Sequence, residues 1–143
     1  MNAFLSYQTD DKVIAGRVQQ LLETFPVPSF LAHEDIEVSA EWRSELLKKL
    51  RKTDIFIPIL SKNFYQSVWC QQESGIAAFR KMTIVPLSID GSIPQGFLSQ
   101  FQATKLDPNT PDIRALLPGI ARRNAAFLSG FGEKGDLIDE RET

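Results

Sequence analysis

The sequence is poor in residues that form disulfides or bind transition metals: among its 143 residues it has one cysteine, Cys70, and one histidine, His33. A single cysteine excludes an intramolecular disulfide and indicates a reducing compartment. A zinc site would have only these two soft ligands, at a separation that no metal motif shows, so the sequence predicts no metal. As a nucleophile and base the pair is also disfavoured, because only a helix start lies near Cys70 to lower its pKa.

Long hydrophobic runs and an excess of one charge are absent too. No apolar run approaches the length of a membrane span, and residues 1–11 lack the basic and apolar segments of a leader. The chain has 16 basic and 18 acidic residues, a net charge of -2. We therefore expect a cytoplasmic protein without a membrane or nucleic-acid partner. The basic cluster in residues 48–52 falls in the last turns of a predicted helix, where cations complement the helix dipole.

The common phosphate-binding and nucleophile motifs are missing as well. There is no G-x-S-x-G elbow, no P-loop and no G-x-G-x-x-G, and the pair Gly130 and Gly132 follows no predicted strand. Asp10 and Asp11 imitate the acidic pair of a phosphoacceptor domain, but the run at 55–60 ends without the aspartate that such a domain requires. A carboxylate site remains as the candidate for chemistry.

The pattern of what is present indicates one α/β domain. Short apolar runs that are typical of strands covered on both faces occur at 3–7, 29–32, 55–60 and 83–89, with a weaker one at 103–106. Segments with helical periodicity lie between them: one over 13–25 opened by Thr9, Asp10 or Asp11, one opened by Ser39, one over 68–80 and one over 112–127 interrupted by Pro118. This alternation predicts a flavodoxin-like, doubly wound, mostly parallel sheet of about five strands with helices on both faces.

Two prolines fall inside the predicted strands, and the end of the chain changes in composition. Pro58 and Pro86 lack the N–H of a sheet ladder, which suggests bulges or edge positions. Residues 129–143 become Gly-rich and then charged, and we expect a polar tail or linker there, after a domain over 1–128. Ligands of such sheets lie beyond the carboxyl ends of the strands, which places the search in the loops near Ser6, His33 and Ser61, and near Asp90.

One helix that follows this edge carries a notable pair. Trp69 and Glu73, within SVWCQQE, are spaced i, i+4 and share one helix face. An indole wall beside a carboxylate can stabilise an oxocarbenium-like centre or supply a base or nucleophile. By itself W-x-x-x-E is a weak pattern, and a half-buried tryptophan beside a solvated glutamate is the commoner arrangement in a helix.

The order of several motifs resembles the Toll/interleukin-1 receptor (TIR) domain family from Ala3 to about Phe127. The motifs are FLSY at 4–7, Asp35-Ile36 with Trp42 around the loop after the second strand, Asp54 before the third strand, and SVWCQQE at 67–73. The resemblance implies a flavodoxin-like fold and one of two activities. These are cleavage of the nicotinamide–ribose bond of NAD+ and assembly of signalling complexes through contacts between TIR domains.

In catalytic members of that family a glutamate at the position of Glu73 is essential. The resemblance implies that Glu73 stabilises the ribosyl cation as nicotinamide leaves, and that Trp69 lines the pocket. Ser6 and Tyr7, where the first strand ends, would shape its floor.

Two more substrate contacts follow from the resemblance. Trp42 occupies a position where some members place an aromatic ring against nicotinamide or the neighbouring protomer's ligand, and Glu37 is expected to reach a ribose hydroxyl. The sequence departs from the family at Ser39, where many members have glycine, and at Gln8 and Thr9, which replace basic residues of some members. These last departures put phosphate contacts there in doubt.

On this resemblance we expect an NAD+ glycohydrolase or ADP-ribose cyclase of prokaryotic type, with NAD+ as substrate and no separate cofactor. It would self-associate through its TIR domain and act as the effector of a defence or stress system under a sensor domain or subunit. The alternative is a non-catalytic module for TIR–TIR contacts. The sequence leaves open a linear or cyclic product, NAD+ or NADP+, and the activating signal.

Overall fold

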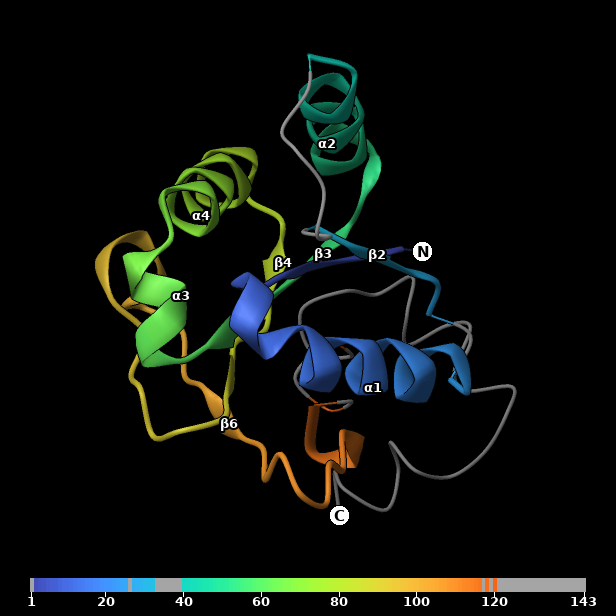
Figure 1. Cartoon of the computed structure of the whole chain (residues 1–143), viewed down its shortest axis with the longest axis vertical. Coiled ribbons are helices and arrows are strands. Elements are labelled where there is room, and N and C mark those ends of the chain that lie inside the picture. Colours follow the sequence, from blue (N-terminus) through green and yellow to red (C-terminus); the bar gives the residue numbers. More distant parts are fainter. Residues whose placement is uncertain (1, 26, 33–39, 117, 119, 121–143) are drawn as a thin grey trace.

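A mostly parallel sheet forms the centre of the computed structural model, which describes residues 2–25, 27–32, 40–116, 118 and 120 (Figure 1). Its strands are β1 (Ala3–Ser6), β2 (Ser29–Leu31), β3 (Ile55–Leu60), β4 (Thr83–Ile84), β5 (Leu87–Ser88) and β6 (Thr104–Lys105). They run in the order β2-β1-β3-β5-β6, with β4 also paired to β3, and the pairings among these described strands are parallel. The predicted flavodoxin-like class is confirmed, and all five predicted runs contain strands.

The run at 83–89 is divided into two short strands, β4 and β5, and a proline on the neighbouring strand explains why. The carbonyls of Phe56 and Leu60 on β3 accept hydrogen bonds from this segment. Because alternate residues of a strand face the same neighbour, Pro58 faces it too, but has no N–H to donate. Pro86 lies in the interruption itself. Of the two predicted alternatives, a bulge or an edge position, the edge position was wrong for Pro58, since β3 has partners on both sides.

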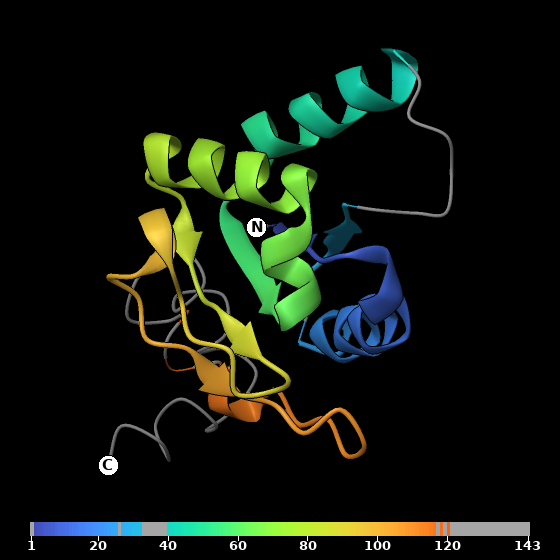
Figure 2. The same cartoon turned by 60° about the vertical axis from the view of Figure 1, so that its left-hand side comes forward.

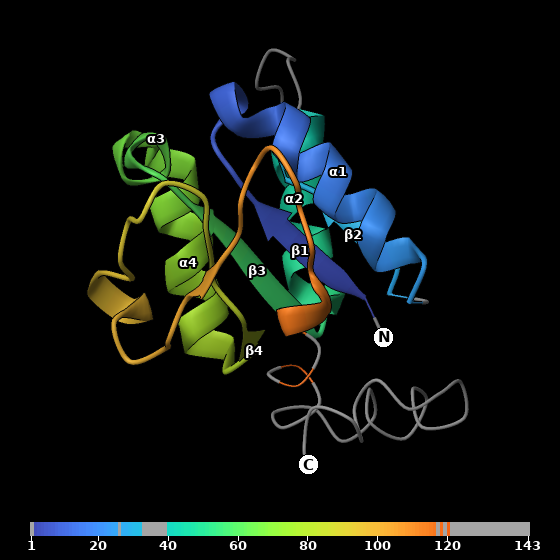
Figure 3. The same ribbon diagram turned by 90° about the horizontal axis from the view of Figure 1, so that it is seen from below.

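Helices cover both faces of the sheet (Figure 2). One face carries α1 (Lys12–Glu23) together with the segment that ends in the 3-10 helix η3 (Arg114–Leu116); the other carries α2 (Ala40–Lys52), α3 (Lys62–Gln66) and α4 (Val68–Arg80). β1 and β3 lie side by side between α1 and α4 (Figure 3). Side chains of a strand alternate between faces, so Leu5 and Tyr7 join the α1 core, while Phe4 joins the α4 core.

The predicted helices are largely confirmed, with differences at their ends. α4 has the predicted bounds, because Ser67 Oγ caps the Cys70 N–H and Lys81 ends the helix in the left-handed region at φ 57. At α1 no side chain makes the expected cap; Gln8 instead caps η1 (Thr9–Asp11). The expected cap Ser39, most of the helix over 112–127 and the tail over 129–143 lie outside the described residues.

Three short elements were not predicted: η1, α3 and the 3-10 helix η2 (Gly96–Leu98). None of them is long enough to show a hydrophobic period, and the capping residue Ser61 is the local signal for α3. Within the described part of the chain, no helix has both the length and the apolar character to cross a membrane.

Candidate functional site

The carboxylate of Glu73 lies against the end of β1. Glu73 is only 1% exposed, and Ser6 Oγ donates a hydrogen bond to its Oε1 at 2.6 Å. Ser6 reaches α4 because it shares a face of β1 with Phe4, and it is the last residue of that strand. The carboxylate is therefore held by the protein at the carboxyl edge of the sheet, rather than solvated on a helix surface.

Trp69 lies one turn before Glu73 and contacts the other tryptophan of the chain. Its ring meets the Trp42 ring edge-on, with centroids 5.6 Å apart and an interplanar angle of 86°. Both rings are half-buried, and both pack against the α4-side core. The contact joins α2 to α4 and brings two sequence-predicted site residues together.

A small pocket opens between these two helices. Its volume is about 160 Å³, and it is lined mainly by aliphatic side chains together with Trp69, Glu73 and two other polar residues; the full set is Arg43, Leu46, Leu47, Leu50, Trp69, Gln72, Glu73 and Ile76. It is smaller than the roughly 300–1,000 Å³ of typical ligand pockets. Glu73 thus borders an apolar space that is too small for a dinucleotide.

A larger cleft lies on the other side of Trp69. It measures about 500 Å³ and runs between η1 and the junction of α3 and α4, lined by Gln8, Thr9, Asp10, Asn63, Gln66, Ser67, Val68 and Trp69. Trp69 is the residue common to both cavities. Sequence reasoning did not find Asn63, Gln66 or Arg43, since α3 was not predicted and Arg43 carries no motif signal.

The predicted site residues do not all meet. Tyr7 follows Ser6 directly and so points to the opposite face of the sheet, where it is 1% exposed and lines a groove beside α1. The structure therefore separates Tyr7 from Glu73 and keeps Ser6, Trp42, Trp69 and Glu73 on one face. Glu37 lies outside the described residues, as do His33 and Asp35.

Two other titratable residues near this edge, Cys70 and Asp11, have contacts that serve the fold. Burial raises the pKa of the Cys70 thiol to about 12, and the neighbouring Glu73 carboxylate adds to the rise, so the thiol is a poor nucleophile. Asp11 accepts a hydrogen bond from Ser61 Oγ at 2.6 Å, and Ser61 Oγ in turn accepts one from the Phe64 N–H. Asp11 thus joins the start of α1 to the start of α3.

The fold and this edge define a flavodoxin-like α/β protein with a carboxylate held at the ligand-bearing ends of its strands. More particularly, the sequence matches the family model of the TIR domain over residues 3–117, so the chain belongs to the TIR domain family. That family includes NAD+-cleaving and scaffolding members, and its domains generally self-associate.

No curated protein matches the sequence. Among solved structures, the chain is similar to a 2-deoxyribosyltransferase from the psychrotolerant bacterium Bacillus psychrosaccharolyticus. The match has a TM-score of 0.58 and 19% identity, and covers 81% of this chain and 96% of that one. At this identity the likeness concerns the fold alone.

Proposed function

We propose that this TIR domain is an NAD+ nucleosidase that cleaves the bond between nicotinamide and ribose. The observation that carries the proposal is the buried Glu73 carboxylate, held by Ser6 at 2.6 Å and placed one helical turn from the Trp69 ring. A side-chain carboxylate beside an aromatic ring suits a reaction whose transition state carries positive charge on a sugar. A role as effector of a cytoplasmic defence or stress system is part of the same proposal.

The proposed reaction needs no redox partner. The bond between ribose C1′ and the nicotinamide nitrogen breaks, and its electron pair leaves with nicotinamide, which becomes neutral. The positive charge that develops on the ribose is stabilised by the Glu73 carboxylate. Water then adds at C1′ and releases a proton to give ADP-ribose; addition of an atom of the same nucleotide in place of water would give a cyclic product.

Access to Glu73 sets a condition on this activity. The residue is 1% exposed and borders a pocket of about 160 Å³, while the cleft of about 500 Å³ lies beyond Trp69. We infer that substrate enters the larger cleft, and that Trp69 or α2 moves so that the ribose reaches the carboxylate. Self-association of TIR domains would hold that arrangement, so activity should rise when the protein is clustered.

The test is release of nicotinamide from NAD+ by concentrated protein, free in solution and immobilised at high density. Glu73→Gln removes the charge at constant size and should abolish release in both states. Glu45→Gln on α2 is the matched control, because Glu45 is exposed and lines neither cavity. Equal release by wild type and Glu73→Gln would contradict the proposal.

The second candidate function is a non-catalytic TIR–TIR scaffold. It is favoured by two large apolar side chains that are exposed to solvent. Phe79 on α4 is 87% exposed, and Phe97 on η2, which contacts α4, is 73% exposed. Exposed apolar side chains that adjoin one another in a patch are typical of a contact surface. No nicotinamide release from clustered protein, together with self-association that Phe79→Ser weakens, would favour this function over the enzyme.

A further inference from the structure

The pocket between α2 and α4, which we call the α2–α4 pocket, is too small for a dinucleotide, but its size and lining suit a single ring. Its volume is about 160 Å³, close to that of an engineered apolar cavity of roughly 150 Å³ that binds benzene. Leu46, Leu47, Leu50 and Ile76 supply apolar walls, and Trp69 supplies an aromatic one. A phenyl ring therefore matches this pocket in both size and polarity.

The other members of the lining are compatible with an apolar guest that comes from outside. Arg43 and Gln72 are exposed, so their polar ends can stay in water while a ring is buried beside them. Glu73 already accepts a hydrogen bond from Ser6. Leu47 is 48% exposed, so the apolar wall continues to the protein surface. The α2–α4 pocket is therefore open to a side chain of another molecule.

A ring of this size is exposed on η2. Phe97 is 73% exposed, although the next residue, Leu98, is only 1% exposed and belongs to the α4-side core. The loop before η2 is held by Tyr65, whose hydroxyl donates to the Ile93 carbonyl and accepts from the Gln95 N–H, both at 2.9 Å. Phe97 thus extends from a backbone that is fixed on both sides. An aromatic side chain presented in this way loses little conformational freedom when it binds.

Phe97 and the α2–α4 pocket lie on opposite sides of α4. Both η2 and α2 contact this helix, and Figure 2 and Figure 3 show α4 between them. A ring on one side of α4 cannot enter the pocket on the other side of the same chain. One partner molecule cannot face both sides at once either. If the ring and the pocket meet, they do so between copies that are arranged head-to-tail.

We propose that copies of this chain associate head-to-tail, with Phe97 of one copy seated in the α2–α4 pocket of the next. Each copy uses two different surfaces, so the assembly can grow beyond a dimer. Because Trp69 and Glu73 line the pocket, the inserted ring lies beside the helix face that carries the candidate site. The contact does not depend on the proposed catalytic activity, and it can be tested by molecular mass without any measurement of turnover.

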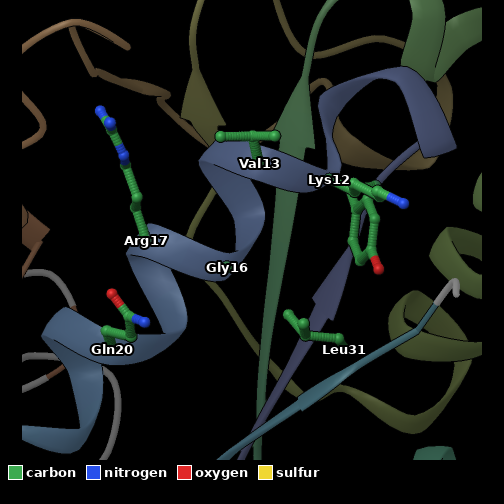
Figure 4. A pocket seen from close by; sticks show the side chains of 7 residues that line it. Lys12, Val13, Gly16, Arg17, Gln20 and Leu31 are labelled. Atoms are coloured by element: carbon green, nitrogen blue, oxygen red, sulfur yellow. The ribbon is translucent and has the colours of Figure 1, made fainter.

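The experiment is sedimentation velocity of the full chain over a series of protein concentrations. Wild type should form dimers and longer species as the concentration rises. Phe97→Ser removes the ring and Leu47→Arg places a charge in the pocket wall, and each should weaken association at least about thirtyfold, as loss of a buried aromatic anchor does. The matched controls are Val13→Ser, an exposed apolar residue that extends from α1 (Figure 4), and Ser44→Arg, an exposed residue of α2 outside the pocket. Both controls should associate as wild type does.

A mixture of the two interface variants tests the pairing itself. Phe97→Ser keeps the pocket and Leu47→Arg keeps the ring, so a mixture should form dimers with one copy of each variant, and these dimers should not grow longer. Such dimers also show that both variants are folded, since each supplies one intact surface. The proposal is overturned by wild type that stays monomeric, by a mixture that stays monomeric, or by association that Leu47→Arg abolishes and Phe97→Ser does not.

Discussion

Ser6 and Glu73 are 67 positions apart in the sequence, yet Ser6 Oγ donates to Glu73 Oε1 at 2.6 Å in the buried interior. Ser6 is held by β1 and Glu73 by α4, so the hydrogen bond between them fixes the position of the Glu73 carboxylate relative to the edge of the sheet. A buried carboxylate that loses a donor is destabilised, because nothing replaces the water that it left.

Ser6→Ala should therefore lower both stability and the proposed activity. We expect a loss of about 1.5–3 kcal/mol in the free energy of unfolding, the usual range for a hydrogen bond to a charged group. Nicotinamide release should fall mainly in kcat, since Ser6 acts through Glu73 and not on the substrate. Thermal unfolding and steady-state kinetics measure the two effects.

Ser74→Ala is the control for this substitution. Ser74 is also a buried serine on this side of the sheet, but its Oγ donates to the Cys70 carbonyl at 2.8 Å within α4. It should keep kcat close to that of the wild type. An equal loss of kcat in both variants would show that the effect of Ser6 is general loosening of the core.

The buried thiol of Cys70 gives a pH dependence of stability. Burial, with a contribution from Glu73, raises its pKa from 9.0 to about 12 in the folded chain. Above pH 9 the unfolded chain loses this proton while the folded chain keeps it, so the contribution present below pH 9 is lost as the pH rises towards 12. The free energy of unfolding should fall by up to about 1.4 kcal/mol per pH unit in that window from this group.

Denaturant titrations between pH 8 and 10.5, on the order of half a unit apart, measure this slope against that of Cys70→Ala. The variant should start less stable, because it leaves a cavity, but should lose less stability as the pH rises. Native Cys70 should also resist alkylation that occurs readily in denaturant. Parallel slopes in the two proteins would contradict the assigned cause.

The fold was accessible from the sequence because strand runs and helix periods are local signals, as α4 shows by having the bounds that were predicted for it. The site could be predicted only in part. Spacing placed Trp69 and Glu73 on one helix face, but the partner of Glu73 depends on which residue of β1 points at α4. Successive residues of a strand point to opposite faces, so Ser6 and Tyr7 cannot both do so, although the sequence prediction placed both in the site.

Ser61 follows β3 directly and bonds to residues of η1 and α3, which form walls of the large cleft. Its replacement should lower the stability of the fold. Its Oγ accepts from the Phe64 N–H at the start of α3 and donates to Asp11 at 2.6 Å. Ser61→Ala should cost about 0.5–2 kcal/mol of stability, the range for a lost helix cap. Thermal unfolding measures it, with the exposed Ser44→Ala on α2 as the control. A melting temperature unchanged by Ser61→Ala would contradict a capping role.

The two tryptophans allow the place of substrate binding to be read directly. Trp69 borders both cavities, while Trp42 lines neither, so in Trp42→Phe the single remaining indole reports on the proposed path to Glu73. In Trp42→Phe/Glu73→Gln, which should not turn NAD+ over, NAD+ should quench the fluorescence of Trp69 saturably, because stacking places the nicotinamide ring against the indole.

AMP supplies the contrast in the same variant. It lacks the nicotinamide ring that is expected to stack on the indole, so it should leave Trp69 fluorescence unchanged. Quenching by NAD+ that disappears in Trp42→Phe/Glu73→Gln/Asn63→Leu would extend the contact to the wall of the large cleft formed by α3. Saturable NAD+ binding without any change in Trp69 fluorescence would place the substrate elsewhere and count against Glu73 as the catalytic carboxylate.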